Sequence, residues 1–566
     1  MEIYLDANAT TPVIAAARDA ALAAMSLDFG NPSSTHSRGL QAKSLKESVR
    51  ASARRVLGAA SGQLLFVSGA TEGIQTAVLS ALASLKRAEP GKAPLRWLLH
   101  GATEHKAVPE ALAHWNALLG LNLEVRAIPV GQDGRHDLAW LREHAPQAGM
   151  VCTMAANNET GVISDLRGIA QALEHSPALW MVDGVQALGK LPLHLQALPI
   201  DYAPFSGHKL YAPKGIGLLY VREGAPFTPL IVGGGQEGAW RSGTENMTGI
   251  AALGAVLSAL ENGTLFQDHD TLQAFRQQLM AALQEAFPPI VFNAPLESSL
   301  PTTINFAVPG VEGTVLLNLF DAAGVRVSGG SACGAAKARP SYVLEAMGLP
   351  ARQIDSAIRL SFGPADTAGF IAEACTRIRA CGAALRQSGL LPGAKQEIEA
   401  EAEAEVGHCS SRSPIHEQEL QPATTQQTEC PAHPSPCSLP DLTEKQKNAA
   451  GERDSVTSIE VDRNAATTLA REHDTVLLLD VREAYEQCFS APPQLGSNVQ
   501  YIKAPLSKLP GMLPDLLALH AGQPILFICR SGNRSAQAAR SVRRLGHEAA
   551  WSLAGGLALW PRDAAT

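Results

Sequence analysis

The sequence has few charged residues and no basic block. Lys, Arg, Asp and Glu make up 18% of the 566 residues, and the formal net charge is −8. Without a cluster of Lys and Arg, we expect no direct contact with nucleic acid. No apolar run reaches the roughly 18 residues of a membrane-spanning helix, and the N-terminal stretch MEIYLDANATTPV lacks the basic and apolar regions of a signal peptide. We therefore expect a cytoplasmic protein without a membrane segment.

Cysteine is sparse as well. The nine cysteines have no regular spacing, which argues against a secreted disulfide scaffold. In a reducing compartment, each thiol then serves either packing or chemistry. We expect packing for the cysteines in apolar strand-like or helix-like runs, namely Cys152, Cys375, Cys381 and Cys488. No spacing matches a standard metal motif, so we expect no metal site.

Apolar residues are abundant, at 46%, and their arrangement predicts an α/β fold. A chain of this length suggests about two to four domains. From residue 1 to 390, strand-like runs such as QLLFVSG and LWMVDGVQ alternate with helical stretches such as TAVLSALASLKRA. Such alternation predicts a parallel sheet with helices on both faces, and ligands then bind at the carboxyl ends of the strands.

Composition changes sharply at residues 391–455. This stretch is rich in Glu, Gln, Ser and Pro and poor in large apolar residues, so we expect a flexible acidic linker. Its Cys and His residues match no metal motif, and we interpret them as solvated: His408, Cys409, Cys430, His433 and Cys437. Strand, loop and helix patterns return at 456–566 and predict a second, smaller α/β domain.

A lysine with unusual neighbours marks the first candidate site. In DYAPFSGHKLYAPKGIG, Lys209 stands among small, aromatic and Pro/Gly residues, and a desolvated lysine can attack carbonyl groups. Upstream, Asp183 ends a strand-like run, where its carboxylate could keep a pyridine nitrogen protonated. In VSGATEG, Ser68, Thr71 and backbone amides ahead of a helix suit a phosphate group.

The order and wording of these stretches resemble the cysteine desulfurases, which are fold-type-I pyridoxal-phosphate enzymes of the class V aminotransferase family. The matching words are YLDANATTPV, FGNPSS, GATE, TEHKAV, NNETGV, VDGVQALGKLP, FSGHKLYAPKGIG, RSGTEN, GSAC and AIRLSFG. The resemblance extends to about residue 385. It implies that residues 1–390 form a large domain with a mainly parallel sheet and a small α/β domain.

The resemblance implies a role for each matching residue around the cofactor ring. Lys209 would bind pyridoxal phosphate covalently. Asp183 would pair with the pyridine nitrogen of the cofactor, and Gln186 with its phenolic oxygen. His105 would stack on the ring and move protons.

The phosphate of the cofactor would be held by a second group of residues. By the same resemblance, Thr71, Ser206 and His208 bind it from one subunit. Thr244 would reach the phosphate from a second subunit, so the resemblance also implies a homodimer.

On the substrate side, the resemblance implies that Asn158 and Arg359 hold the carboxylate of L-cysteine, a task that suits a planar guanidinium. Asn158 would also touch the cofactor, and Asn31 would line the site. Cys333 lies in the bare stretch SGGSACGAAKARP, where a structural thiol has no bulky neighbours to pack against. We interpret Cys333 as the thiolate that takes the substrate sulfur as a persulfide and leaves L-alanine. The same thiol could transiently ligate an iron–sulfur cluster.

A second cysteine stands at the start of a loop suited to an anion. The stretch PILFICRSGNRSAQAAR places Cys529 between a strand and a helix, where loop amides and the helix N-terminus favour a thiolate. Phosphatase loops have the spacing Cys-x5-Arg, whereas four residues separate Cys529 from Arg534. The tighter ring favours a single persulfide sulfur over a phosphate.

Together with LLDVREAYE and GGLALW, this loop resembles the rhodanese family over residues 456 to about 564. The resemblance implies a persulfide on Cys529. The loop residues that would cradle it are Arg530, Ser531, Gly532, Asn533, Arg534 and Ser535. We expect Asp480 and Arg482 to be structural and to bridge strand and loop.

The two resemblances combine into one hypothesis. The first domain would extract sulfur from L-cysteine onto Cys333, and the second would accept it on Cys529 and pass it to a sulfur-acceptor protein. Iron–sulfur assembly, tRNA thiolation and sulfur-cofactor synthesis are all open as destinations. A flexible linker of about sixty residues spans roughly 40 Å, so the two sites could meet.

Two alternatives remain open at this point. The first domain could be a selenocysteine lyase or another class V aminotransferase. The rhodanese module could be a binding adaptor instead of an enzyme.

Overall fold

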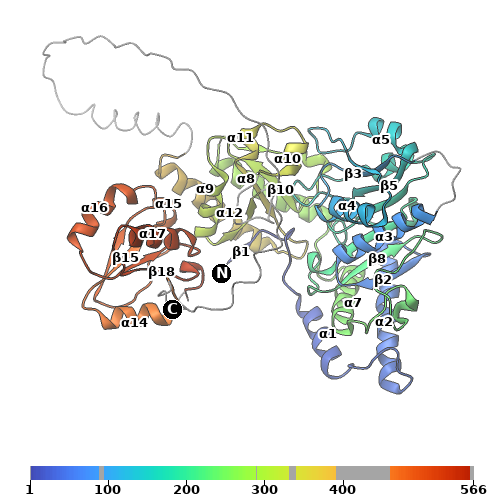
Figure 1. Cartoon of the computed structure of the whole chain (residues 1–566), viewed down its shortest axis with the longest axis horizontal. Helices are drawn as coiled ribbons and strands as arrows, with labels where there is room; N and C mark the ends of the chain where they lie inside the picture. The colour runs from blue at the N-terminus through green and yellow to red at the C-terminus, as the bar shows by residue number, and fades with distance from the viewer. Residues whose placement is uncertain (1, 88–94, 289, 330–339, 391–458, 561–566) are drawn as a thin grey trace, which may run out of the picture. The chain divides into compact units, whose positions relative to one another are not determined.

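A computed structural model describes residues 2–87, 95–288, 290–329, 340–390 and 459–560 (Figure 1). The chain divides into two compact units, Met1–Pro392 and Gly393–Thr566, and each is described by itself. Cys333 and the expected linker at 391–455, with its Cys and His residues, lie outside the described residues. Of the helices in the described ranges, none has the length and apolarity needed to cross a bilayer.

A seven-stranded sheet forms the centre of the first unit. Its strand order is β2-β8-β7-β6-β5-β3-β4. The strands are β2 (Gln63–Val67), β8 (Gly217–Val221), β7 (Tyr202–Ser206), β6 (Leu179–Asp183), β5 (Ala148–Met154), β3 (Trp97–Gly101) and β4 (Glu124–Ile128). The predicted mainly parallel sheet is confirmed, with β8 antiparallel to both of its neighbours.

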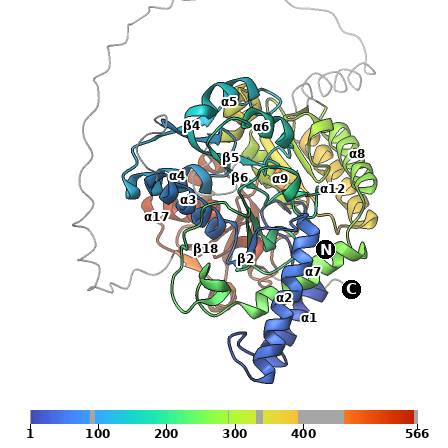
Figure 2. The same cartoon turned by 90° about the vertical axis from the view of Figure 1, so that its right-hand side faces the viewer.

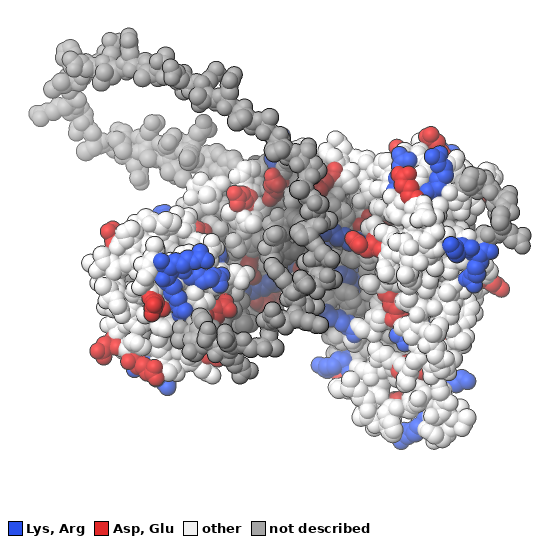
Figure 3. Space-filling view, viewed as in Figure 1, with Lys and Arg blue, Asp and Glu red and all other residues white. Residues whose placement is uncertain are grey.

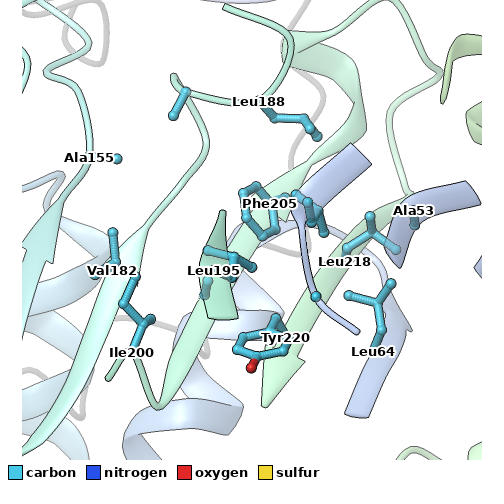
Figure 4. Packing of buried hydrophobic residues seen from close by; sticks show 14 of the residues in the cluster. Ala53, Leu64, Ala155, Val182, Leu188, Leu195, Ile200, Phe205, Leu218 and Tyr220 are labelled. Atoms are coloured by element: carbon cyan, nitrogen blue, oxygen red, sulfur yellow. The ribbon is translucent and has the colours of Figure 1, made fainter. Parts of the chain in front are cut away.

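Strand β2 shows why these strands read as continuous apolar runs. Leu64 and Phe66 pack into the core of one face together with Leu218 of β8 (Figure 4). Leu65 and Val67 pack into the core of the opposite face. Successive side chains of a strand point to opposite faces, and helices cover both faces, so each position is apolar.

Two groups of helices supply these covers. Helices α3 (Ala70–Arg87) and α4 (Ala107–Leu119) pack on the face of Leu65. Helices α2 (Ser37–Leu57), α5 (Leu138–His144), α6 (Leu166–Ala172) and α7 (Met247–Asn262) pack on the face of Leu64. Helix α1 (Ala15–Ser26) lies along α7, beside α2 (Figure 2). The predicted three-layer arrangement is thus present.

A smaller antiparallel sheet completes the first unit, with strand order β12-β13-β10-β9. Its strands are β12 (Ser328–Gly329), β13 (Ala357–Ser361), β10 (Thr303–Ala307) and β9 (Val291–Phe292). The helices of this part are α8 (His269–Ala286), α9 (Gly313–Ala322), α10 (Tyr342–Ala346), α11 (Ala351–Ile354) and α12 (Ala368–Gln387). β1 (Ile3–Tyr4) pairs with β11 (Val325–Arg326), and Asp6 bridges to Ser361, so the N-terminal segment runs beside β13.

The second unit is a five-stranded, all-parallel sheet with strand order β14-β18-β17-β15-β16. The strands are β14 (Glu460–Val461), β18 (Ala550–Leu553), β17 (Ile525–Ile528), β15 (Val476–Asp480) and β16 (Val499–Lys503). The helices are α14 (Arg463–Glu472), α15 (Ala484–Gln487), α16 (Leu509–Leu519) and α17 (Asn533–Arg544). The predicted small α/β architecture is confirmed.

Charged side chains are sparse on the face of the molecule drawn in Figure 3. On the face drawn in Figure 3, Lys and Arg occur in small groups among Asp and Glu, and uncharged surface predominates. On this face, the few charged residues thus form no large patch of one sign.

Asp480 and Arg482 form a buried ion pair at the end of β15. Arg482 Nε and Nη2 donate to the carboxylate of Asp480 at 2.9 and 2.6 Å, and Tyr501 Oη donates to it at 2.8 Å. Both charged residues are nearly inaccessible, at 0% and 1% exposure. Arg482 also donates to the carbonyl of Ser490, so the pair ties the strand end to the following loop.

We predict that Asp480→Ala lowers the free energy of unfolding of the second unit by about 3–5 kcal/mol, because it leaves the Arg482 charge buried without its partner. Asp474→Ala removes an exposed carboxylate just before the same strand and serves as the control, with an expected change near zero. Urea unfolding followed by circular dichroism measures both changes. Equal stability of the two variants would contradict a structural role for the pair.

Candidate active site

A cavity of about 460 Å³ opens where β5, β6 and β7 end, bordered by Met154, Asp183 and Ser206. The volume suits a small-molecule ligand. The implied site residues that line it are Thr71, His105, Asn158, Asp183, Gln186, Ser206, His208, Lys209 and Arg359. Residues from opposite ends of the first unit's sequence thus meet at the edge that the strand pattern predicts.

Two implied residues lie elsewhere. Asn31 is exposed after α1, where its side chain accepts a hydrogen bond from the amide of Ser33. Thr244 is exposed and lines a different pocket with Gly215 and Arg241. Neither borders the cavity of its own chain, so their roles stay predictions.

Lys209 follows β7 in a short 3₁₀ turn, Gly207–Lys209. Its Nζ donates to the carbonyls of Asn8 and Ala9, both at 2.7 Å. The N-terminal segment therefore holds the amine of Lys209 at the cavity. A lysine in this position can react with the carbonyl group of a ligand.

Asp183 supplies a buried carboxylate at the end of β6. Burial raises its pKa to about 6, opposed by the hydrogen bond from the Val185 amide at 2.9 Å and by the charge of Lys209. Glu104 lies near it and is fully buried, and burial together with the charge of Asp183 holds the pKa of Glu104 well above its usual range. Asp183 thus suits a cationic partner such as a protonated ring nitrogen.

A second lysine, Lys190, lies beneath Gln186. Its Nζ donates to Gln186 Oε1 at 2.7 Å and to Asn8 Oδ1 at 2.9 Å. Because Nζ donates here, the Gln186 amide presents its oxygen to Lys190. The NH₂ group of Gln186 donates to the carbonyl of Asn8 at 3.2 Å, and its second N–H is the donor that a ligand can use. Sequence reasoning assigned no role to Lys190 or Asn8, although both lie in the quoted words VDGVQALGKLP and YLDANATTPV.

Two of the phosphate-binding residues predicted from the sequence, Thr71 and Ser206, lie at the start of α3. Ser206 Oγ accepts from the amide of Ala70 at 3.2 Å, and Thr71 follows in the first turn. The first amides of a helix have no partner within the helix and attract anions. His208 Nδ1 lies 3.1 Å from Thr10 Oγ1, and burial with the charges of Lys209 and Lys214 lowers the pKa of His208 to about 4. His208 is therefore a neutral hydrogen-bonding group at pH 7.

Arg359 on β13 presents a guanidinium that is only partly satisfied. Nη2 pairs with Asp6 at 2.5 Å, and Nη1 donates to the carbonyl of Asn158 at 3.1 Å. Arg359 Nε and Asn158 Oδ1 are buried and have no hydrogen-bond partner among the described residues. Buried polar atoms of this kind normally find partners, so these two atoms suit a polar ligand in the cavity.

His105 borders the cavity at the start of α4. Its Nδ1 accepts from the amide of Ala107 at 3.2 Å, which places the proton of the neutral ring on Nε2. Desolvation and the charges of Lys209 and Lys106 lower the pKa of His105. A neutral imidazole at pH 7 can accept a proton from a thiol.

Taken together, the residues fit pyridoxal phosphate. The cavity offers an amine for its aldehyde, a carboxylate for its ring nitrogen, an amide donor for its phenolic oxygen and a helix N-terminus for its phosphate. Arg359 Nε and Asn158 Oδ1 remain for the carboxylate and amino groups of an amino-acid substrate. This donor set was expected from the sequence, and the cavity contains it.

The second unit builds a different site around Cys529, which follows β17. The amides of Gly532 and Ser535 donate to Cys529 Sγ at 3.1 and 3.4 Å. Gly556 packs against the loop so closely that a Cβ atom there would lie 2.4 Å from the carbonyl oxygen of Cys529. Arg534 forms two hydrogen bonds with the buried Glu486, at 2.6 and 2.5 Å. The backbone amides, rather than Arg534, therefore contact the sulfur.

The other described cysteines are free thiols. Cys152, Cys375 and Cys381 are buried, as expected for packing residues. The expectation for Cys488 is wrong, because this residue is exposed and its thiol donates to the carbonyl of Tyr485 at 2.9 Å. Cys488 directly follows the one-turn helix α15, whose buried residues are Tyr485 and Glu486.

Comparisons with known proteins agree with this geometry. Residues 3–371 match the family model "Aminotransferase class-V", and residues 465–563 match "Rhodanese-like domain". A cysteine desulfurase of Cereibacter sphaeroides is 38% identical over 372 residues, which are 65% of this chain and 92% of that protein. The cysteine desulfurase NifS of Azotobacter vinelandii is 36% identical over 368 residues, covering 64% of this chain and 87% of that protein.

Solved structures give the same picture for the first unit. A protein titled NifS-like superposes with a TM-score of 0.59 at 31% identity and covers 67% of this chain and 98% of its own. DndA from Streptomyces lividans superposes with a TM-score of 0.53 at 33% identity and covers 64% of this chain and 99% of its own.

The buried Lys190 makes a prediction about pH. Burial, with the charges of Lys209 and Arg359, lowers the pKa of Lys190 from 10.5 to about 7. Between these values the unfolded chain binds more protons than the folded chain, so this residue makes stability rise with pH. From pH 7 to pH 9, the unfolding free energy of the wild type should gain on the order of 2 kcal/mol relative to Lys190→Met. Urea titrations at both values measure it, and a difference independent of pH would contradict the burial of this charge.

Proposed function

We propose a sulfur relay within one polypeptide, because this chain belongs to the class V aminotransferase family as a pyridoxal-phosphate-dependent cysteine desulfurase and also carries a rhodanese-like sulfurtransferase domain. Sulfur from L-cysteine would pass first to Cys333 and then to Cys529. The observation that carries the proposal is the presence of both sites in one chain: a cavity with a reactive lysine, and an amide-lined thiol.

When bound, pyridoxal phosphate supplies an electron sink that lets the bonds at the substrate's α- and β-carbons react. In our proposal Lys209 holds the cofactor covalently and Asp183 keeps its ring nitrogen protonated. Gln186, oriented by Lys190, donates to the phenolic oxygen. Thr71, Ser206 and His208 hold the phosphate at the start of α3.

The substrate carboxylate would bind to Arg359. Asp6 already occupies Nη2, and Nε is the buried donor without a partner among the described residues. Asn158, whose carbonyl accepts from Nη1, would turn its free Oδ1 to the substrate. This arrangement would hold the carboxylate of L-cysteine while Arg359 keeps its hydrogen bonds to Asp6 and Asn158.

His105 would accept the proton of the Cys333 thiol, since its lowered pKa keeps the imidazole neutral at pH 7. The Cys333 thiolate would then form a bond to the substrate sulfur while the carbon–sulfur bond breaks. The electron pair of that bond stays with the carbon fragment, which takes up a proton and leaves as L-alanine. The flanks of residues 330–339 support this role, since Gly329 pairs with Ile358 beside Arg359 and Tyr342 lines the cavity.

In the second step the Cys529 thiolate would attack the outer sulfur of the Cys333 persulfide. A new sulfur–sulfur bond forms on Cys529, and the electron pair of the broken bond returns to Cys333. The cradle at 529–535 supports this step because the amides of Gly532 and Ser535 face the sulfur. A sulfur-acceptor protein would then take the sulfur from Cys529 by the same exchange.

The wider organisation is part of the proposal. We assign the desulfurase to residues 1–390, a linker to 391–455 and the rhodanese domain to 456–566. A homodimer would bring Thr244 of one copy to the phosphate of the other, which agrees with its exposure. We also propose a reducing, cytoplasmic setting, in which the described cysteines would stay free thiols.

We predict that a single turnover with ³⁵S-labelled L-cysteine labels both Cys333 and Cys529 in the wild type. Cys529→Ala should keep the label on Cys333, and Cys333→Ala should neither form alanine nor label Cys529. Non-reducing peptide mapping locates the sulfur, and Cys488→Ala is the control that leaves the pattern unchanged.

Two outcomes would overturn the relay. Label that stays on Cys333 and never reaches Cys529 would make the second domain a binding module. Alanine formation by Cys333→Ala would instead favour another class V activity.

A further inference from the structure

Behind the Cys529 loop, two hydroxyl groups form a chain that ends on the sulfur. Ser552 Oγ donates to Ser535 Oγ at 2.9 Å, and Ser535 Oγ lies 3.2 Å from Cys529 Sγ. Each of the three residues is 0% exposed. Ser552 Oγ also lies 3.4 Å from the carbonyl of Gly532, but its shorter hydrogen bond is the one to Ser535, whose hydroxyl contacts the sulfur.

Ser552 lies on β18 and pairs in register with Phe527 of the adjacent strand β17, just ahead of Cys529. Alternate positions of β18 face opposite cores, and Ala550 packs into the core that contains Cys529. Ser552 lies two positions after Ala550 and therefore faces the same core, where an apolar residue would be the usual choice. A fully buried hydroxyl group costs free energy unless it forms a hydrogen bond. The hydroxyl of Ser552 forms one with Ser535 of the Cys529 loop.

The protons of this chain can be assigned one by one. Ser535 has a single hydroxyl proton and two acceptors within reach, the carbonyl of Gly532 at 3.0 Å and Cys529 Sγ at 3.2 Å. The carbonyl of Gly532 already accepts from the Ala536 amide at 2.9 Å in α17. Ser535 can therefore turn its proton to the sulfur and leave no carbonyl without a partner.

Ser552 determines how well Ser535 serves as that donor. The hydroxyl proton of Ser552 is donated to a lone pair of Ser535 Oγ. The proton of Ser535 therefore points away from Ser552 and is available to an acceptor in the loop. Donors in a chain polarise one another, and a hydrogen bond to a charged acceptor is stronger than one to a neutral acceptor. A negatively charged Cys529 sulfur thus gains more from the chain than a neutral thiol does.

We propose that Ser552 is a positioning residue for sulfur transfer at Cys529, acting through the hydroxyl of Ser535. The inference rests on the proposed role of Cys529 as sulfur carrier. When an acceptor thiolate attacks the outer sulfur of the Cys529 persulfide, the sulfur–sulfur bond breaks and its electron pair stays on Cys529 Sγ. The acceptor leaves as a persulfide, so no net oxidation occurs. The hydroxyl chain stabilises the thiolate that this step releases.

The test measures the pH dependence of Cys529 alkylation in the full-length protein. Iodoacetamide modification is followed by quantitative peptide mass spectrometry, which separates Cys529 from the other cysteines. The variants are Ser552→Ala, Ser535→Ala and the double variant, and Ser541→Ala is the control because Ser541 is exposed on α17. Exposed Cys488 serves as the internal reference in each sample.

We expect Ser552→Ala to move the midpoint of the Cys529 profile to higher pH and to slow alkylation at pH 7 by about threefold to tenfold, the effect of weakening one hydrogen bond to a charged group. Ser535→Ala should slow it further, and the double variant should match Ser535→Ala. Ser541→Ala and the Cys488 profile should not change. Thiosulfate:cyanide sulfurtransfer at pH 7 should follow the same order.

The outcomes separate this inference from the proposed function. A wild-type profile in Ser552→Ala, with circular dichroism showing a folded chain, would overturn the positioning role. So would a double variant whose loss equals the product of the two single losses, because Ser552 would then act independently of Ser535. If the relay fails in ³⁵S labelling while the profiles shift as expected, the hydroxyl chain stands and the sulfur donor is different.

Discussion

The first unit depends on how its N-terminal segment satisfies buried cations. Lys190, Lys209 and Arg359 all meet acceptors from this segment: Asn8 Oδ1, the carbonyls of Asn8 and Ala9, and Asp6 Oδ1. Clustered cations without acceptors would be costly to bury. Asp6 pairs with Arg359, and the carboxylates of Asp183 and Glu159 also line the cavity, so groups of both signs border it. The cations suit the anionic groups of a ligand, and Asp183 suits a cationic group such as a protonated ring nitrogen.

The second unit stabilises negative charge by other means. At Cys529 the donors are backbone amides and two serine hydroxyls, while the nearby Arg534 is paired with Glu486. Amides fixed by a tight loop need no rearrangement when charge appears on the sulfur. The two sites thus suit different tasks: one binds anions in a cavity, and the other holds a single sulfur atom.

Much of the architecture could be predicted from local patterns. Continuous apolar strands, polar strand ends and helices between them indicate a covered parallel sheet, and the cavity lies where that sheet ends. Residues of the quoted motifs, such as Asp183 and Lys209, can be identified from the few residues on either side of them in the sequence. The antiparallel direction of β8 was not predicted, because an apolar pentapeptide such as GLLYV reads the same in either direction.

Other parts of the sites depend on contacts between distant segments. Asp6 meets Arg359 across 353 positions and Asn8 meets Lys190 across 182, so no local pattern indicates either pair. Ser552 likewise reads as an ordinary strand residue until β18 is placed beside β17. Cys488 was misjudged because an apolar neighbourhood in sequence does not say on which side of a short helix a residue lies.

The central claim is that the N-terminal segment holds Lys209, and not the neighbouring Lys190, where it can bind pyridoxal phosphate. Incubation with the cofactor, reduction with borohydride and peptide mass spectrometry identify the lysine that carries the covalent pyridoxyl group. The account predicts the modification on Lys209 alone, with Lys190 unmodified beneath Gln186. Modification of Lys190, or of neither lysine, would contradict it.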